Sequence, residues 1–148
     1  MRLVYKIQNT CMLFKIVTPE KIVYENEISQ VSLPTTTGEI TILPHHIPLV
    51  SVLQSGELRL VDKDGQHLLA IAGGFVEVRN NNEVIVLTDN AEPASEIDID
   101  RAETVRKLAK EQMQALKNIE NVDYARLQSV LDRELNRIRV GKKYRKLP

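Results

Sequence analysis

The sequence predicts a mainly β chain with a helical end: an N-terminal antiparallel β-sandwich or flattened barrel, followed by a C-terminal antiparallel two-helix hairpin. Two observations lead to this fold class. Up to about residue 90, short apolar runs alternate with turn signals and leave no room for helices, which is typical of an antiparallel sandwich. From Ile97 onward, apolar residues recur every three or four positions, which is the period of an amphipathic helix.

Turn-forming residues divide the first part of the chain into short strands. The Asp-Gly pair at 64–65 predicts a tight hairpin, and the three asparagines at 80–82 predict a second turn, because asparagine tolerates positive φ. Pro34 is expected to end an alternating strand, and the Gln-Ser-Gly run at 54–56 is expected to form a turn. The expected strands are 13–17, 28–33, 38–43, 49–53, 58–61, 67–72, 75–79 and 83–88.

Two adjacent glycines, Gly73 and Gly74, separate two of these strands. A phosphate cradle is one interpretation, but the rest of any phosphate-binding fingerprint is missing and no helix follows. A β-bulge, or a close contact between two sheets, explains the pair better.

A loop between two expected strands is the clearest candidate for a docking surface. Residues 38–43 have the pattern of a strand, and two prolines, Pro44 and Pro48, then interrupt its ladder because they lack a backbone N–H. The residue before each proline favours extended geometry, which predicts a stiff projecting loop rather than a helical turn. His45 and His46 are neighbours on this loop, so they point to opposite sides and do not suit a shared metal ion.

Two amphipathic helices complete the chain. Asp98 or Asp100 can cap the first helix, and Asp123 is placed to cap the second, after an interruption at 117–121. Gly141 is expected to end the second helix and leave a frayed basic tail. The apolar stripes are Ala102, Val105, Ala109, Met113 and Leu116 on the first helix, and Tyr124, Leu127, Leu131, Leu135 and Ile138 on the second.

These elements divide the chain into five segments. The first is an extension, either disordered or preceding the true start, since Met12 stands directly before the first strand. The segments are the extension over 1–11, a β-sandwich docking domain over 12–90, a linker over 91–96, a helical hairpin over 97–140 and a basic tail over 141–148.

The composition is that of a globular protein. The 148 residues suffice for one ordinary domain and a smaller appendage, and 43% are hydrophobic and 27% charged, as in globular chains. No apolar run approaches the roughly 20 residues that cross a bilayer, so we expect no direct membrane insertion and any membrane association to depend on partner proteins. The single Cys11 allows no internal disulfide.

The formal net charge of zero hides a division between the two parts of the chain. Residues 1–96 carry 7 Lys and Arg against 12 Asp and Glu, whereas residues 97–148 carry 13 against 8. The basic part suits an acidic or nucleotide partner, although a solvated helical face explains its charge equally well. Arg126, Arg133 and Arg137 lie on one face of the second helix, where they suit either a triphosphate or, more simply, solvent.

Three ordered motifs resemble the epsilon subunit of F-type ATP synthases. They cover about residues 13–140 at spacing similar to the family's. The chain departs from the family at Thr41 and His45, where glycine is common, and at Leu108, where nucleotide-binding members can carry arginine. The motifs are Gly38-Glu39-Ile40-Thr41-Ile42-Leu43-Pro44-His45-His46-Ile47-Pro48-Leu49-Val50, then Ala72-Gly73-Gly74-Phe75-Val76-Glu77-Val78, and then Ile97-Asp98 followed by Arg101-Ala102.

The resemblance implies a non-catalytic central-stalk subunit of a rotary ATP synthase. The sandwich is expected to dock on the gamma subunit and the c-subunit ring, and the helical hairpin to inhibit ATP hydrolysis when it extends toward the alpha and beta subunits. No cofactor is required, but ATP is a candidate regulatory ligand of the compact hairpin. The implied docking residues are Gly38, Glu39, Ile42, His45, His46 and Ile47, and the implied ATP-binding residues are Glu92, Asp98, Arg101, Arg126, Arg133 and Arg137.

Other function classes fit less well. A nucleic-acid-binding module that uses the basic helices would need aromatic residues among its charges, and only 4% of the chain is aromatic. A carbohydrate-binding sandwich is disfavoured because the chain has no Trp to stack on sugars. The sequence contains no recognisable catalytic set and no metal-ligand spacing. The resemblance places the protein peripherally on the cytoplasmic side of a bacterial membrane, with the plastid thylakoid membrane as the alternative.

Overall fold

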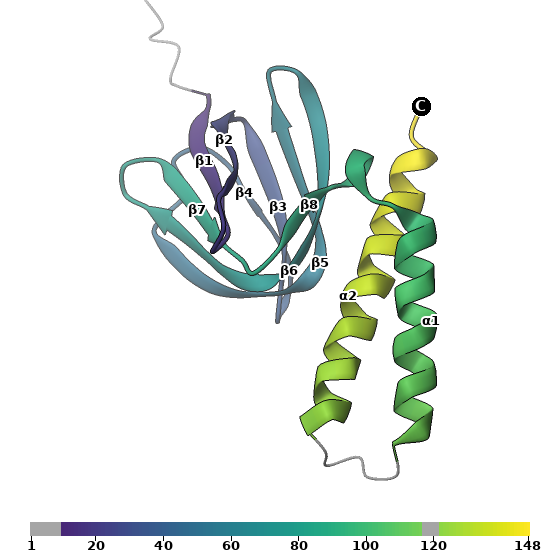
Figure 1. Ribbon diagram of the computed structural model, residues 1–148. Coiled ribbons are helices and arrows are strands. Elements are labelled where there is room, and N and C mark those ends of the chain that lie inside the picture. Colours follow the sequence, from purple (N-terminus) through teal and green to yellow (C-terminus); the bar gives the residue numbers. More distant parts are fainter. Residues whose placement is uncertain (1–9, 117–121) are drawn as a thin grey trace, which may run out of the picture.

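The computed structural model describes residues 10–116 and 122–148, which form a curled β-sandwich with two helices packed against one side (Figure 1). Most of the predicted extension 1–11 and the predicted interruption at 117–121 lie outside the described residues. The strands are β1 (Met12–Val17), β2 (Ile22–Ile28), β3 (Gln30–Thr35), β4 (Gly38–Ile42), β5 (Leu49–Asp62), β6 (Gly65–Arg79), β7 (Glu83–Leu87) and β8 (Ala91–Pro93). A short 3-10 helix (Ala94–Glu96) then leads to α1 (Ile99–Ala115) and α2 (Val122–Arg145).

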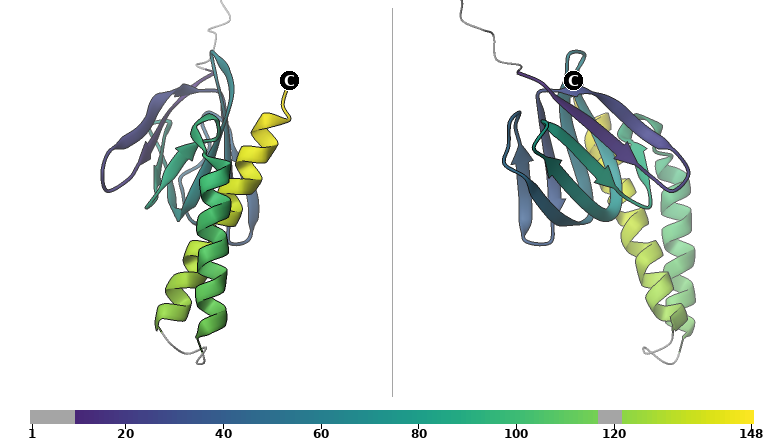
Figure 2. Two further views of the ribbon diagram at one scale, coloured as in Figure 1. Left: turned by 45° about the vertical axis from the view of Figure 1, so that its right-hand side comes forward. Right: turned by 90° about the vertical axis from the view of Figure 1, so that its left-hand side faces the viewer.

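The strands form one sheet that curls around a common core (Figure 2). Their order is β2-β1-β7-β6-β5-β3-β4, with β8 added beside β6. The predicted antiparallel pairing holds for every described pair except β1 and β7, which run parallel. Five strands separate β1 from β7 along the chain, so no tight turn dictates their relative direction.

The core inside the curled sheet follows the alternation of the sequence. On β1, Met12, Phe14 and Ile16 are buried, while the residues between them are only partly buried. Burying such side chains contributes about 1.5 to 3 kcal/mol each, which makes this alternation the main determinant of the strand register.

Two predicted strand boundaries are wrong, and one contact between them explains why. Pro34 lies inside β3, and the predicted turn at 54–56 lies inside β5, which continues without interruption to Asp62. The β3–β5 ladder shifts register between Ser32 and Thr35, so the missing N–H of Pro34 falls at an irregular point of the pairing. A Cβ added to Gly56 would lie 2.8 Å from Pro34 Cγ, so this glycine makes room for the proline ring.

Gly73 and Gly74 lie at a close approach of two neighbouring strands within one sheet, rather than at the predicted contact between sheets. Both glycines lie within β6, which is one strand rather than the two predicted, and their φ angles are 87° and 123°. A Cβ added to Gly74 would lie 1.9 Å from the carbonyl oxygen of Leu87, at the end of β7. Only a residue without a Cβ fits between these two strands.

The two predicted hairpin turns are confirmed, and the second one fastens distant segments. Asn82 has a φ of 60°, as expected for asparagine in a turn. Its side-chain amide donates to the carbonyl oxygen of Cys11 at 2.9 Å, and its side-chain oxygen accepts the backbone N–H of His45 at 2.8 Å. The turn between β6 and β7 therefore holds the start of β1 and the predicted docking loop together.

The helical pair packs on the outer face of β6. Asp98 caps α1 as predicted, since its carboxylate accepts the backbone N–H of Arg101 at 3.0 Å. Asp123, in contrast, lies inside the first turn of α2, where its charge still favours the helix dipole. Neither helix of the described chain has the length and apolar character needed to cross a bilayer. The buried cluster under the helices is Leu68, Ala70, Ala94, Ile97, Ile99, Ala102, Ile138 and Val140.

The predicted end of α2 at Gly141 is wrong, and most of the predicted basic tail is helical. α2 continues to Arg145, and Gly141 packs so closely that an added Cβ would lie 3.0 Å from Ile99 Cγ1. Lys142 reaches Glu103 on α1 at 3.0 Å, and Lys143 reaches Glu57 on β5 at 2.8 Å. Tertiary contact therefore extends this helix past a residue that would end it in isolation. The predicted linker 91–96 is likewise ordered, as β8 and the 3-10 helix.

Glu83→Gln is expected to destabilise the fold at neutral pH but not in acid. Lys15 lies 3.2 Å from one Glu83 oxygen and Arg79 lies 3.2 Å from the other. The hydrogen bond from Lys15, supported by Asn81 and Arg79 against the effect of burial, holds the pKa of Glu83 below its usual value. A lowered pKa adds stability above the unfolded-state value, and this stability is lost as the pH falls through the folded-state value.

Urea unfolding followed by circular dichroism at pH 7 and pH 3 would measure this effect. At pH 7 the free energy of unfolding of the wild type is expected to exceed that of the variant by about 1 kcal/mol. This difference should shrink toward zero at pH 3. If the difference in the free energy of unfolding stayed constant from pH 7 to pH 3, the charge of the Glu83 carboxylate would contribute nothing to stability.

Candidate functional site

The loop between β4 and β5 is an exposed turn held in one conformation. His46 donates its backbone N–H to Leu43 at 3.2 Å, which closes a turn with Pro44 and His45 at its centre. Proline suits the first central position, and His45 takes a φ of 64° at the second, where glycine would be less strained. The departure from the family's glycine at this residue therefore adds a side chain at a position that favours glycine.

The predicted docking residues fall into an exposed group and one buried residue. Ile47 is 74% exposed, and His45 is exposed beside it. Glu39 lies on the edge strand β4, forms an ion pair with Arg59 and keeps about half of its side chain exposed. Ile42 is wrong as a docking residue, because its side chain is fully buried in the sandwich core. Gly38 begins β4 with a φ of 127°, and His46 is partly buried, with its ring Nδ1 2.7 Å from the carbonyl oxygen of Ile47.

A row of exposed apolar side chains crosses three neighbouring strands close to this loop. Val52 on β5 pairs with Phe75 on β6, and Phe75 pairs with Leu87 on β7. Val50 extends the row two residues nearer the loop, and all four side chains are exposed. We call Val50, Val52, Phe75 and Leu87 the exposed apolar row. Sequence reasoning missed it because the opposite faces of the same strands are also apolar, so alternation did not distinguish the outside from the core.

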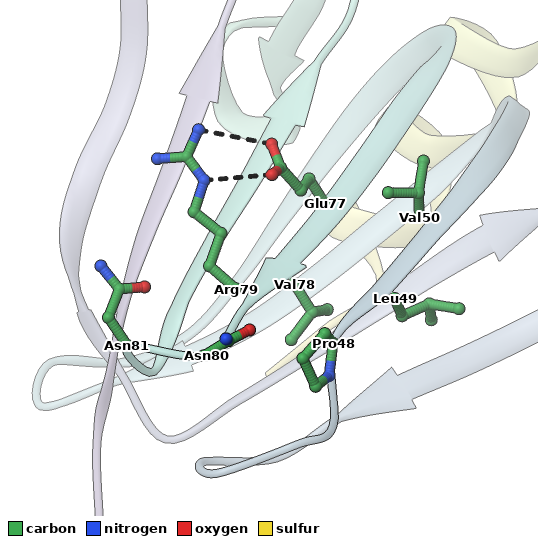
Figure 3. A pocket seen from close by; sticks show the side chains of 8 residues that line it. All are labelled: Pro48, Leu49, Val50, Glu77, Val78, Arg79, Asn80 and Asn81. Carbon is green, nitrogen blue, oxygen red and sulfur yellow. Dashed lines mark hydrogen bonds and ion pairs between the residues drawn. The ribbon is translucent and has the colours of Figure 1, made fainter.

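A hollow of about 520 Å³ lies beside the loop where β5 and β6 meet the β6–β7 turn (Figure 3). Pro48 and Val50 supply apolar wall on one side, and Glu77 and Arg79 form an ion pair at 3.2 Å on the other. The hollow is shallow and has an apolar and a charged side, which suits a protruding side chain of a protein partner better than a small substrate.

Two of the three predicted arginines on α2, Arg133 and Arg137, bond carboxylates, although Arg133 also stays exposed to solvent. Arg137 donates Nε and Nη2 to the two oxygens of Glu92, at 2.6 and 3.0 Å, and Nη1 to Glu134 at 2.7 Å. These hydrogen bonds, led by those to Glu92, raise the pKa of Arg137 above its already high value. Arg133 donates Nε to the other oxygen of Glu134 at 3.1 Å. Glu92 and two of the predicted arginines are thus brought together by Glu134, a residue that the sequence analysis did not select.

The third predicted arginine lines a cavity beside this cluster. Arg126 and Arg133 face a space of about 540 Å³ between α2 and the sandwich, with Asp89 and Asp132 also in its wall. Asp98 and Arg101 are not in this wall. Asp98 is engaged in capping α1, and Arg101 is exposed in the first turn of that helix. The structure therefore groups Glu92, Arg126, Arg133 and Arg137, but not the whole predicted nucleotide set.

Asn136→Ala is expected to loosen the attachment of α2 to the sandwich. The buried Asn136 side chain donates to the carbonyl oxygens of Gly56 at 2.9 Å and Ile71 at 3.3 Å. Its loss removes this donor from both carbonyl oxygens. The Ser55 hydroxyl still donates to Ile71 at 3.3 Å, but the Gly56 oxygen loses its bond to the helix, so the free energy of unfolding should fall by about 1 to 3 kcal/mol. Urea unfolding followed by circular dichroism measures this change. Gln128→Ala is the matched control, because the Gln128 side chain donates to Asp132 within α2, so its loss should lower the free energy of unfolding far less.

Among residues 10–116 and 122–148, no group of three or more His, Cys, Asp or Glu side chains is placed to hold a metal ion. The described surface carries apolar side chains and ion pairs around the loop, and a carboxylate–arginine cluster under α2.

Comparison with known proteins gives family matches over nearly the whole chain. A family model described as ATP synthase, Delta/Epsilon chain, beta-sandwich domain matches residues 11–94, and one described as the long alpha-helix domain of the same chain matches residues 95–142. A protein called ATP synthase epsilon chain from Halalkalibacterium halodurans is 42% identical over 126 residues, covering 85% of this chain and 93% of the relative. One from Dehalococcoides mccartyi is 42% identical over 133 residues, covering 90% and 94%.

Solved structures with a similar fold come from mitochondrial assemblies. A chain in the cryo-EM structure of Euglena gracilis mitochondrial ATP synthase (OSCP/F1/c-ring) aligns with a TM-score of 0.70 and 19% identity, covering 83% of this chain and 76% of that one. A chain of the Tetrahymena thermophila mitochondrial ATP synthase central stalk/c-ring aligns with a TM-score of 0.58 and 18% identity, covering 90% and 95%. At these identities the likeness is one of fold.

Proposed function

Because this chain belongs to the family of ATP synthase epsilon chains, we propose that it is a non-catalytic subunit of the central stalk, which docks its sandwich on the gamma subunit and the c-ring. The similar chains in solved structures come from assemblies described by their c-ring and central stalk, which supports this choice of partners. As part of the ATP synthase complex, the chain would transmit rotation between ring and stalk while other subunits perform the phosphoryl chemistry.

The exposed apolar row is the observation that carries the docking proposal. Four large apolar side chains stand on adjoining strands, and Ile47 projects from the loop beside them. Contiguous apolar surface of this kind, rimmed by ion pairs such as Glu77–Arg79, is typical of protein interfaces. We therefore assign this face, together with the loop residues His45 and Ile47, to the rotor partners.

The helical hairpin is proposed to be the regulatory element. In the compact form, α2 is attached to the sandwich by Asn136, Arg137 and Lys143, all through polar contacts with β5, β6 or β8. Ile138 and Val140 of α2 also belong to an apolar cluster with Leu68 and Ala70 of β6, so a second position of the helices has to replace this buried surface, as contact with another subunit would. In the extended position, the helices would contact the alpha and beta subunits and inhibit ATP hydrolysis.

A cross-linking experiment tests both parts of the proposal. Glu57→Cys and Lys143→Cys, in a chain with Cys11→Ser, place two thiols where an ion pair now joins β5 to α2. Bridging them with a short bismaleimide should keep the hairpin compact. The bridged subunit is expected to assemble with gamma and the c-ring as the wild type does, and to give an ATP synthase with faster ATP hydrolysis than the unbridged one.

Single-cysteine variants treated with the same reagent are the control. Equal hydrolysis rates with and without the bridge would overturn the inhibitory role of the hairpin. Failure of the wild-type chain to bind gamma or the c-ring would overturn the docking role.

The nucleic-acid alternative gains no support from the position of the basic residues. Arg137, Lys142 and Lys143 are paired with Glu92, Glu103 and Glu57. For localisation, we propose a peripheral position on the cytoplasmic side of a bacterial membrane, reached through the rotor partners.

A further inference from the structure

The Glu134 side chain is buried against two arginines, unlike a helical residue that faces solvent. It is only 2% exposed, and each of its two oxygens accepts a hydrogen bond from a different guanidinium group, Arg133 at 3.1 Å and Arg137 at 2.7 Å. A carboxylate with two oxygens and two guanidinium donors satisfies the same geometry that a phosphate group would satisfy there.

The formal charges of this cluster balance without a second anion. Arg133 and Arg137 are balanced by Glu92 and Glu134. The neighbouring cavity adds the positive charge of Arg126 and the negative charges of Asp89 and Asp132. A polyphosphate that entered the cavity would meet a site with no net positive charge. To bind the nitrogens that Glu134 now occupies, Arg133 Nε and Arg137 Nη1, it would have to displace the Glu134 carboxylate.

Displacement is difficult because Glu134 belongs to the same helix as both arginines. Glu134 and Arg137 are three positions apart, so the helix itself holds them near each other, and Arg133 adjoins Glu134 in the chain. The carboxylate therefore competes as a tethered ligand. A free anion loses translational and rotational entropy when it binds, whereas the tethered carboxylate does not.

We propose that Glu134 acts as a built-in anion in place of nucleotide phosphates between α2 and the sandwich, so that the compact hairpin of this chain closes without ATP. The inference rests on the proposed function only for the identity of the free anion, ATP. Glu134 is then a specificity-determining residue: its carboxylate makes the site selective against polyphosphates.

Isothermal titration of the 148-residue chain with MgATP tests the proposal. Glu134→Gln keeps the size of the side chain and removes its charge, so ATP should bind about tenfold or more tightly than to the wild type. Adding Arg133→Ala to this variant should remove the gain. Asp132→Asn is the matched control, because it removes one negative charge from the same cavity wall while its side chain contacts Gln128 rather than the arginines.

Each result has a defined meaning. Equal ATP affinity in the wild type and Glu134→Gln, or an equal gain in Asp132→Asn, would overturn the proposal. Glu134→Met, which fills the buried space without charge, serves as a second variant in the same titration. If either variant is unfolded alone, ATP is expected to restore its circular dichroism spectrum, and failure of ATP to do so would also overturn the proposal. These measurements use no rotor partner, so their outcome is independent of whether the chain docks on gamma and the c-ring.

Discussion

Gly74→Ala is expected to abolish the stable sandwich, or to lower the free energy of unfolding by about 4 kcal/mol or more. The added Cβ would lie 1.9 Å from the carbonyl oxygen of Leu87 and 2.9 Å from its carbonyl carbon. Both neighbours are backbone atoms of an adjoining strand, so no side-chain rotation can relieve the collision. Urea unfolding followed by circular dichroism measures the loss, and a variant recovered only as an aggregate would agree with it.

Gly38→Ala separates the collision from backbone strain. Gly38 has a φ of 127°, close to the 123° of Gly74, but an added Cβ would meet nothing within 4 Å. In this variant only the strain of positive φ should lower the free energy of unfolding, by about 1 to 3 kcal/mol. If both variants lost the same stability, the close approach of β6 and β7 would not be the cause.

Phe75→Glu is expected to remove docking on the rotor partners while leaving the fold intact. The side chain is 53% exposed at the centre of the exposed apolar row, between Val52 and Leu87, so the fold should lose less than about 1 kcal/mol. In the proposed interface, a buried and unpaired carboxylate would replace a central aromatic contact. The affinity for a gamma and c-ring assembly should therefore fall by about 100-fold or more. Surface plasmon resonance with the purified assembly measures this affinity.

Leu108→Glu is the matched control, because Leu108 on α1 is also 53% exposed but lies on the helical pair. Its affinity for the rotor assembly should stay within about twofold of the wild type, since surface changes outside an interface have little effect. If Phe75→Glu bound as tightly as Leu108→Glu, the exposed apolar row would not be the docking face.

Local sequence signals predicted the features that depend on a few neighbouring residues. The turn at Asp64-Gly65, the positive φ of Asn82 and the capping of α1 by Asp98 all come from the preferences of single residues, and all are confirmed. The strand predicted at 13–17 is likewise present, as β1 (Met12–Val17).

Tertiary contacts decided the boundaries that the sequence analysis misplaced. Pro34 continues β3 because Gly56, distant in sequence, leaves space for its ring. Gly141 continues α2 because the helix packs against Ile97 and Ile99 at that point. In both cases a residue that interrupts structure in isolation is tolerated, because a packed partner supplies more free energy than the local preference costs.

Of the candidate sites, one was predicted from the sequence, and two depend on tertiary contacts. The loop with His45 and Ile47 was predicted, because two prolines restrict its backbone and no partner within the chain is needed to define it. The exposed apolar row and the burial of Glu134 were not, because both depend on which face of a strand or helix meets another element. By itself the sequence determined the fold class, the family, the two hairpin turns and the cap of α1. Only the tertiary structure decided where the long strands β5 and β6 continue, which apolar side chains stay outside and which carboxylate binds the arginines, because burial is a property of the packed whole.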